Sequence, residues 1–487
     1  MRAVDIKIEQ LTSFLAKDLR ISHCPNEHAM LQIEGSISDA EVETVHRFAV
    51  AEEPICVSAQ GEGATWKWCG MVYDVEIQYL FHEKYLKLVL VSPSIKMDRK
   101  QKTRSFQDKG TTIGDIINYV CQDYNALVTL NGADIPAGGM IVQYQETDWE
   151  FVKRLASHLN QQIIVHTQFN DLVMDVGFSG AGGTANITGP CVYQKDFQAL
   201  YRGADYALSD ADVDIVRVES RELYDIMSCL QTDKGVFYIY RIDSMFQQEE
   251  LVLHYEGYRE SNFKTPFVKN EKIVGASLNG TVHAVSGTKI QVNLDVDANN
   301  SLCGWKDFPY ATVYSSNAGT GWYCMPEVGD TVRVYFPSAA EDEAYAISSV
   351  HLDVAMDDSR SNPQIKSISN AQKKQIVFYP EGILLQNTEN MYVSLDDTAG
   401  ITIVSDLPIN ILSDTSITLN AAEDIMINGT SQVVLKQGLT ATTIKQDGAE
   451  EITALGAPDT SDATILMSEG NITVSGVEFR LQENEGV

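Results

Sequence analysis

Alternating apolar and polar positions over residues 1–95 predict half-buried β-strands. The alternation runs through IKIEQL, MLQIEGSI, KWCGMVYDVEIQYLF and YLKLVLVSP, with turn-forming residues between these segments. A period of two places successive side chains on opposite faces of a sheet. Similar strands are predicted later in DVDIVRVES, GVFYIYRIDSMF and ELVLHYEGYRE. Two largely β parts therefore flank a middle region of different character.

The middle region, residues 96–190, carries apolar residues at helical spacing. The two apolar stripes consist of Ile113, Ile116, Ile117 and Val120, and of Trp149, Val152, Leu155 and Leu159. Asp148 stands near the start of the second helix, where a negative charge is favourable. A strand, QQIIVHT, and a glycine-rich loop, residues 177–190, follow. We expect an inserted α/β part here.

Residues 272–352 read as a compact all-β block. KIVGASLNGTVHAV, GTKIQVNLDVD, FPYATVYSS, GWYCMPEVGDTVRVYFP and EAYAISSVHL give about five strands with short turns. This number of strands suits a small Greek-key barrel with the OB fold.

The C-terminal region has an apolar pair that recurs every eight residues. The pairs are Ile401/Ile403, Ile409/Ile411, Ile417/Leu419, Ile425/Ile427 and Val433/Leu435. Ser, Thr, Asn, Asp and Gly fill the positions between the pairs, and weaker traces of the repeat flank them. A fixed short period with β character predicts a β-helix or β-solenoid.

An eight-residue repeat favours three interwound chains over one chain. Two buried apolar side chains per repeat do not offset the entropy of ordering eight residues. A single-chain β-helix has repeats of about 20 residues, enough for three walls per turn. We therefore expect a homotrimeric prism with the apolar pairs on its axis. The alternative is a single-chain solenoid that acts as a passive spacer.

Charge excludes several kinds of partner. The 487 residues carry a net charge of −31, and residues 381–487 hold 17 acidic and 3 basic residues. Such acidity opposes binding to nucleic acid and to anionic lipid headgroups. No apolar run is long enough for a transmembrane helix, and the N-terminus lacks the apolar core of a secretory signal. We expect assembly in the cytoplasm.

The eight cysteines contain no CxxC pair. They are Cys24, Cys56, Cys69, Cys121, Cys191, Cys229, Cys303 and Cys324. In a chain without a secretory signal, we expect free and mostly buried thiols, and no zinc site.

Three stretches in this order resemble the spike proteins of contractile injection systems. This family includes the hub-and-needle proteins of myophage baseplates, VgrG of type VI secretion, and the spikes of tailocins. QYQETDWEFVKRLASHLNQQIIV (143–165) resembles the hub helix motif, GWYCMPEVGDTVRVYF (321–336) resembles the OB signature, and the eight-residue repeat resembles the trimeric β-helix. The motif positions are Tyr144, Asp148, Trp149 and Phe151 in the hub, and Trp322, Pro326, Gly329 and Asp330 in the OB domain.

The resemblance implies a mainly β fold: a two-barrel hub with an inserted α/β part, an OB-fold barrel, and a C-terminal triple-stranded β-helix. The expected domains are residues 1–95 (barrel 1), 96–190 (insert), 191–270 (barrel 2), 271–352 (OB barrel), 353–374 (linker) and 375–487 (needle). Gly329 is expected to permit a turn that a side chain would obstruct. Trp149, Trp322 and Tyr323 are expected to be packing residues.

No motif predicts an enzyme, a cofactor or a metal site. The chain lacks GxSxG, HExxH and a phosphate-binding loop, and its last histidine, His351, precedes the needle. About 25 residues lie between the OB pattern and the needle, too few for a hydrolase. A catalytic site hidden in residues 96–190 is a remote alternative.

We therefore expect a structural spike at the tip of an injection particle. The resemblance implies that the homotrimer binds the tail tube and baseplate, touches the target membrane briefly, and binds no nucleic acid. It leaves room for a separate PAAR-like tip protein. The main alternative is a trimeric receptor-binding tail fibre or adhesin.

Overall fold

The computed structural model contains two compact units, Met1–Asp353 and Val354–Val487, which we describe separately. The described residues are 5–60, 65–80, 83–180, 182–185, 190–197, 209–247, 250–316, 318–347, 362–431, 433–437, 440–447, 450–456, 464–468 and 471–475. Within these ranges, no helix combines the length and the apolar character that crossing a lipid bilayer requires.

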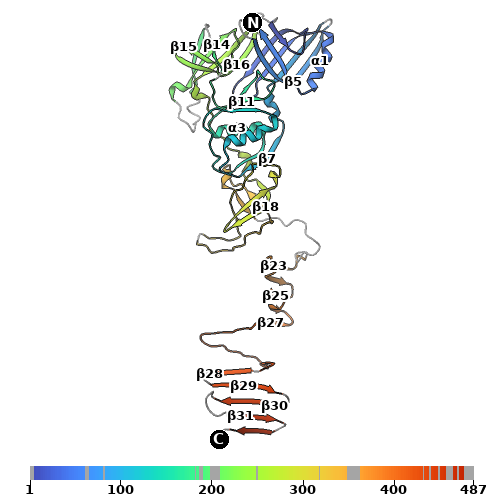
Figure 1. The fold of residues 1–487 in the computed structure, drawn as a ribbon, viewed down its shortest axis with the longest axis vertical. Coiled ribbons are helices and arrows are strands. Elements are labelled where there is room, and N and C mark those ends of the chain that lie inside the picture. Colours follow the sequence, from blue (N-terminus) through green and yellow to red (C-terminus); the bar gives the residue numbers. More distant parts are fainter. Residues whose placement is uncertain are drawn as a thin grey trace. The chain divides into compact units, whose positions relative to one another are not determined.

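Both β parts of the first unit join in one large sheet, which is antiparallel except where β12 pairs with β15 (Figure 1). Its strands, in spatial order, are β1 (Ile6–Ile8), β4 (Ile55–Gln60), β5 (Thr65–Leu80), β6 (Glu83–Val91), β3 (Met30–Ile37), β2 (Leu15–His23), β16 (Gly235–Gln247), β17 (Glu250–Tyr258), β14 (Asp214–Ser220) and β13 (Cys191–Lys195). Two further strands, β15 (Cys229–Thr232) and β12 (Thr184–Ala185), extend from β16. Helix α1 (Val42–Val50) lies between β3 and β4 in the chain.

The two β parts meet where β2 pairs with β16. His23 stands opposite Ile242 in this register. Side chains from both parts, such as Leu31 and Phe237, belong to the same buried cluster. The hub barrels expected from the sequence therefore share one sheet and one core.

The middle region forms an α/β part, as predicted. Its elements are β7 (Gln101–Phe106), α2 (Ile113–Cys121), β8 (Leu127–Leu130), β9 (Ile141–Thr147), α3 (Asp148–His158), β10 (Ile163–His166) and β11 (Val173–Val176). Both helices begin with a capping box, formed by Thr112 with Asp115 and by Thr147 with Glu150. The predicted stripes of α2 and α3 are buried in one cluster, with Leu159 packed against it.

Residues 277–347 form the expected five-stranded barrel. The strands are β18 (Ser277–Ser286), β19 (Lys289–Leu294), β20 (Phe308–Pro309), β21 (Thr331–Tyr335) and β22 (Tyr345–Ile347), in the spatial order β20-β19-β18-β21-β22. A bridge between Tyr310 and Ala346 closes the barrel between its two outer strands. Met140 and Val142, from the α/β part, lie in the core of this barrel. The barrel is therefore fused to the insert rather than merely linked to it.

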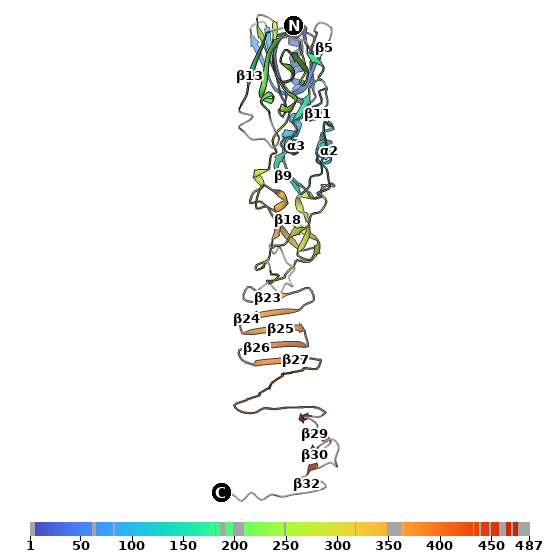
Figure 2. The same cartoon turned by 90° about the vertical axis from the view of Figure 1, so that its left-hand side faces the viewer.

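The second unit contains two antiparallel sheets, each built by strands that follow one another in the chain (Figures 1 and 2). The first has β23 (Lys366–Ser369), β24 (Gln375–Tyr379), β25 (Gly382–Thr388), β26 (Met391–Asp396) and β27 (Gly400–Val404). The second has β28 (Val433–Gln437), β29 (Thr440–Asp447), β30 (Glu450–Gly456), β31 (Thr464–Ser468) and β32 (Asn471–Ser475).

These two sheets differ from the interwound homotrimeric prism that the eight-residue repeat predicts. Their strands pair with neighbours in the same chain through short turns. The physical reason is that a strand of about five residues plus a short turn also repeats every eight residues. The first strand, β23, also lies inside residues 353–374, which we expected to be a linker. The trace of the repeat near residue 480 lies outside the described residues.

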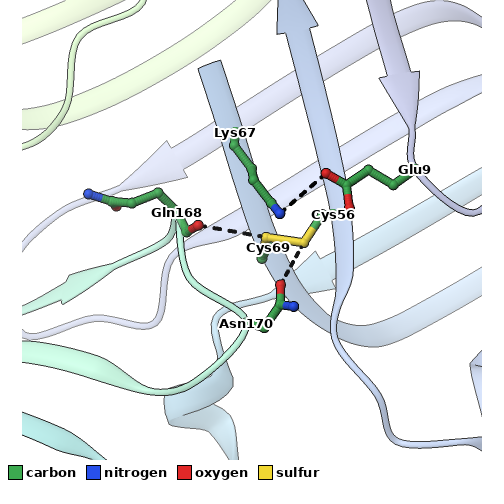
Figure 3. The surroundings of a disulfide bond; sticks show 6 residues. All are labelled: Glu9, Cys56, Lys67, Cys69, Gln168 and Asn170. Carbon is green, nitrogen blue, oxygen red and sulfur yellow. Dashed lines mark hydrogen bonds and ion pairs between the residues drawn. A yellow bond between two sulfur atoms is a disulfide. The ribbon is translucent and has the colours of Figure 1, made fainter. Parts of the chain in front are cut away.

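Two cysteines form a disulfide, so the expectation of only free thiols is wrong. Cys56 stands opposite Cys69 in the β4–β5 register, and the Cα atoms are 4.1 Å apart. Figure 3 shows this pair covered by the loop that carries Gln168 and Asn170, with Asn170 Oδ1 2.9 Å from Cys56 Sγ. Of the six other cysteines, Cys24 and Cys121 are buried, whereas Cys191, Cys229, Cys303 and Cys324 are partly or fully exposed.

Candidate assembly site

The hub motif is organised around the buried carboxylate of Asp148, the first residue of α3. Its Oδ1 accepts hydrogen bonds from Arg104 Nη2 at 2.6 Å and from Gln143 Nε2 at 2.9 Å. Its Oδ2 accepts from Lys102 Nζ at 2.7 Å and from the Tyr124 hydroxyl at 2.6 Å. Four donors therefore occupy about the full number of lone-pair sites that a carboxylate offers.

This network keeps Asp148 charged. Burial alone would raise the pKa of Asp148, but the hydrogen bonds from Lys102, Tyr124 and Gln143 and the charge of Arg104 lower it below its ordinary value. Burial and the same carboxylate raise the pKa of Tyr124, which remains a donor. Because its lone pairs are occupied, Asp148 is suited to hold α3 against β7 and β9, not to accept a proton from a substrate.

Trp149, the hub-motif residue that we expected to be a packing residue, is buried, and Phe151 and Tyr144 also pack against cores. Trp149 is buried and stacks on His28 with a centroid distance of 4.5 Å. Phe151 is buried in the cluster around α2 and α3, and Tyr144 packs against the core of the five-stranded barrel. The motif therefore connects the large sheet, the insert and the barrel.

Arg154 is an important residue that the sequence analysis missed. Its Nε donates to Glu146 Oε1 at 2.9 Å, its Nη2 donates to Val142 O at 2.8 Å, and its Nη1 lies 3.1 Å from Glu341 Oε1. Glu341 belongs to a short helix of the barrel, and burial raises its pKa although Arg154 opposes this shift. Arg154 lies three residues after the buried Phe151, one helical turn away, and a cation at this spacing was the available signal that a buried ion pair forms here.

The OB signature forms a turn that is tied to β18. Gly329 has a φ of +96°, so the predicted need for glycine is confirmed. Its N–H donates to Val282 O at 3.0 Å, and Val282 N–H donates to Asp330 O at 2.9 Å. The carboxylate of Asp330 accepts from Glu327 N at 2.8 Å. Pro326 fixes φ on the approach to this turn.

We expected Trp322 and Tyr323 to be packing residues, and this expectation is wrong. Their exposed fractions are 58% and 70%. They lie in the connection between β20 and β21, which leaves the barrel before the signature turn begins. Aromatic character alone does not distinguish a core position from an exposed arm.

The apolar pairs of the repeat are exposed in the single chain. Nine of the ten predicted needle-core side chains are between 52% and 73% exposed: Ile401, Ile403, Ile409, Ile411, Ile417, Leu419, Ile425, Ile427 and Leu435. Val433 is half-buried. Ile401 and Ile403 lie in β27, and Val433 and Leu435 lie in β28. The chain alone provides no core for these residues.

Residues 405–431 have no strand partner in the described part of the chain. The backbone runs in straight segments and bends at residues 406–407, 414–415, 422–423 and 430–431, a step of eight. No backbone-to-backbone hydrogen bond joins this segment to the described residues. Such a run of unpaired backbone and exposed apolar side chains is typical of a segment that is completed by other chains.

The described residues offer no obvious metal site. Within them, no group of three or more His, Cys, Asp or Glu side chains is arranged to hold a metal ion. The sequence-based expectation that the chain has no cofactor stays a prediction.

Part of the chain matches a known protein family. Residues 48–159 match the family described as phage tail baseplate hub (GPD). No curated protein matches the chain significantly in sequence.

One solved structure shares the fold of much of the chain, and two others are similar at lower scores. The E. coli c3393 protein, a type VI secretion component described as similar to the T4 tail proteins gp27 and gp5, is 14% identical, with 70% of this chain and 98% of that chain covered and a TM-score of 0.52. The 43 kDa tail protein of prophage MuSo2 from Shewanella oneidensis is 11% identical, with 53% and 98% covered and a TM-score of 0.40. The half-lidded Francisella PdpA–VgrG complex is 9% identical, with 94% and 83% covered and a TM-score of 0.40. Residues 48–159 therefore match a baseplate hub domain, and the chain shares its fold with the c3393 protein.

Proposed function

We propose that three copies of this chain form the central spike of a contractile injection machine. The trimer caps the tail tube and pierces the target envelope when the sheath contracts. The single observation that carries this proposal is the segment 405–431, which combines unpaired backbone with exposed apolar pairs at a step of eight.

Three copies complete this segment in a way that one copy does not. Each straight stretch between bends supplies one wall of a triangular turn, and two other chains supply the remaining walls. The apolar pairs then meet on the axis, where each buried side chain contributes about 1.5–3 kcal/mol. The strands of neighbouring chains provide the missing backbone partners, which also removes open strand edges.

The spike acts mechanically and is not an enzyme in this proposal. The sheath performs the work, while the chain supplies stiffness and a polar, acidic outer wall. The net charge of −31 disfavours retention in a membrane with anionic headgroups. The partners are the tail tube and other baseplate proteins, with room for a separate PAAR-like tip protein. The chain is assembled in the cytoplasm and carried at the tip of the particle.

A substitution on the apolar face tests the proposal. The double variant Ile409→Asp/Ile417→Asp places two charges per chain on the proposed axis, so we expect loss of the trimer and loss of killing or delivery, with the hub still folded. Sedimentation and circular dichroism of the full chain measure these outcomes.

The matched control is Asn410→Asp/Thr418→Asp. These residues lie between the members of the same apolar pairs and, at strand spacing, face the other way. The control adds the same number of charges and is expected to remain trimeric and active. A trimer that survives the isoleucine substitutions, or a wild-type chain that sediments as a monomer, contradicts the proposal.

A further inference from the structure

The connection between β20 and β21 forms an arm outside the five-stranded barrel. Ser315 bridges Gly321, Trp322 N–H donates to Tyr314 O at 2.9 Å, and Ser316 N–H donates to Thr320 O at 2.9 Å. These contacts make a short hairpin, which extends sideways below β18 in Figure 1.

Four large apolar side chains of the arm are exposed. Val313 is 90% exposed, Tyr323 70%, Trp322 58% and Tyr314 56%. Tyr314 lies opposite Trp322 in this hairpin, so the two side chains share one face of the arm. The Tyr323 hydroxyl donates to Gly287 O at 2.9 Å, which ties the base of the arm to the barrel of its own chain. An arm of this kind is suited to packing between other surfaces rather than to water.

The arm also contains no charged residue, unlike the rest of the chain. Residues 308–326 contain no Asp, Glu, Lys or Arg, although charged residues make up 21% of the whole chain and the net charge is −31. Copies of an acidic chain repel one another wherever their carboxylates approach. An uncharged apolar arm is therefore a place where one copy approaches another at low electrostatic cost.

We propose that the arm packs against the five-stranded barrel of a neighbouring copy. This inference rests on the proposed trimer, because trimerisation of the C-terminal unit raises the local concentration of the three barrels. The barrel offers apolar surface for such a contact at Val274 and Trp305, which are 48% and 51% exposed. The arms then form a second interface, which adds to the needle contact and depends on it.

The native thiol of Cys324 reports on this contact, because it follows Tyr323 directly and is exposed in the single chain. We expect a maleimide to modify Cys324 at least tenfold more slowly in the full-length trimer than in the Ile409→Asp/Ile417→Asp chain. Cys191, an exposed cysteine of the hub, serves as the internal reference and should react equally in both. Peptide mass spectrometry separates the two sites.

A second variant distinguishes the arm contact from protection by the needle. Trp322→Ser/Tyr323→Ser should remain trimeric in sedimentation, while Cys324 becomes as reactive as in the monomeric chain. In addition, a photoreactive amino acid at Val313, in trimers mixed from ¹⁴N- and ¹⁵N-labelled chains, should cross-link to residues 271–347 of the other isotope.

The outcomes separate the two proposals. A trimer in which Cys324 reacts freely, or in which cross-links stay within one isotope or reach other parts of the chain, overturns the arm contact and leaves the spike proposal standing. A wild-type chain that sediments as a monomer overturns both.

Discussion

At the scale of single residues, buried charged side chains with hydrogen-bond partners hold the hub together. Asp148 is fully buried and is satisfied by two cations, a phenol and an amide. A buried ion pair adds little net stability. Removing one partner, however, leaves the other charge buried and unpaired in a medium of low dielectric, which is costly. The hub motif is therefore a structural requirement for the position of α3.

Replacing Asp148 with Ala should destabilise the first unit strongly. Lys102 and Arg104 lose their common buried partner, so we expect a loss of about 3–5 kcal/mol in the free energy of unfolding. Asp123→Ala is the matched control, because Asp123 contacts the same Lys102 at 2.9 Å but is exposed, and its cost should stay below about 1 kcal/mol. Chemical denaturation measures both, and equal effects would refute the argument.

The pH dependence of stability should follow the same carboxylate. The pKa of Asp148 is lower in the folded chain than its ordinary value of 3.8, so the unfolded chain binds the proton more tightly. Its contribution is present above pH 3.8 and is lost as the pH falls through the lower, folded pKa. In denaturation measured at a series of pH values, Asp148→Asn should lose less stability at acid pH than the wild-type chain. If the loss is unchanged, other carboxylates cause it.

At the scale of elements, turns decide which strands pair within the chain. The turn at Glu327–Asp330 enters β21 and is tied to Val282 of β18. In the second unit, short turns return β24 to β27 antiparallel to one another. Residues 405–431 bend every eight residues without returning, so they have no strand partner within the described part of the chain.

Gly329→Ala should destabilise the barrel only through backbone strain at position 329. An added Cβ meets no atom within 4 Å, so only the positive φ of 96° opposes it. We expect a cost of about 1 kcal/mol or more in thermal or chemical unfolding. Val328→Ala, at the adjacent exposed position, should change stability by less than about 0.5 kcal/mol. If both variants behave alike, the turn does not require glycine.

At the scale of the whole molecule, charge opposes the association that the apolar repeat favours. Each chain contributes a net charge of −31 to the proposed trimer. Salt shortens the range of this repulsion, from about 10 Å at 0.1 M to about 3 Å at 1 M. Trimer formation should therefore depend on ionic strength, whereas the fold of the first unit should depend on it far less.

We expect refolded chains to form trimers faster in 1 M than in 0.1 M NaCl. Light scattering follows assembly, and near-ultraviolet circular dichroism follows the first unit in the same samples. KCl should act like NaCl, because screening depends on ionic strength rather than on the identity of the ion. A rate that is unaffected or lowered by salt would mean that charge repulsion does not limit assembly.

Local periodicity was sufficient to predict the elements whose partners lie nearby. The stripes of α2 and α3, the strands of the closed barrel and the glycine turn at Gly329 follow from residues that interact over short stretches of chain. The Cys56–Cys69 pair was missed, because the strand that carries Cys56, β4, was not among the predicted strands.

The sequence by itself determined the spacing of apolar residues, and hence which segments become helices, strands and the eight-residue repeat. Only the tertiary structure decided which surfaces those residues face: Trp149 is buried, Trp322 is exposed, and Arg154 reaches Glu341, 187 positions away. The physical reason is that periodicity records the face on which a side chain lies, whereas burial depends on which distant segment, or which other chain, covers that face.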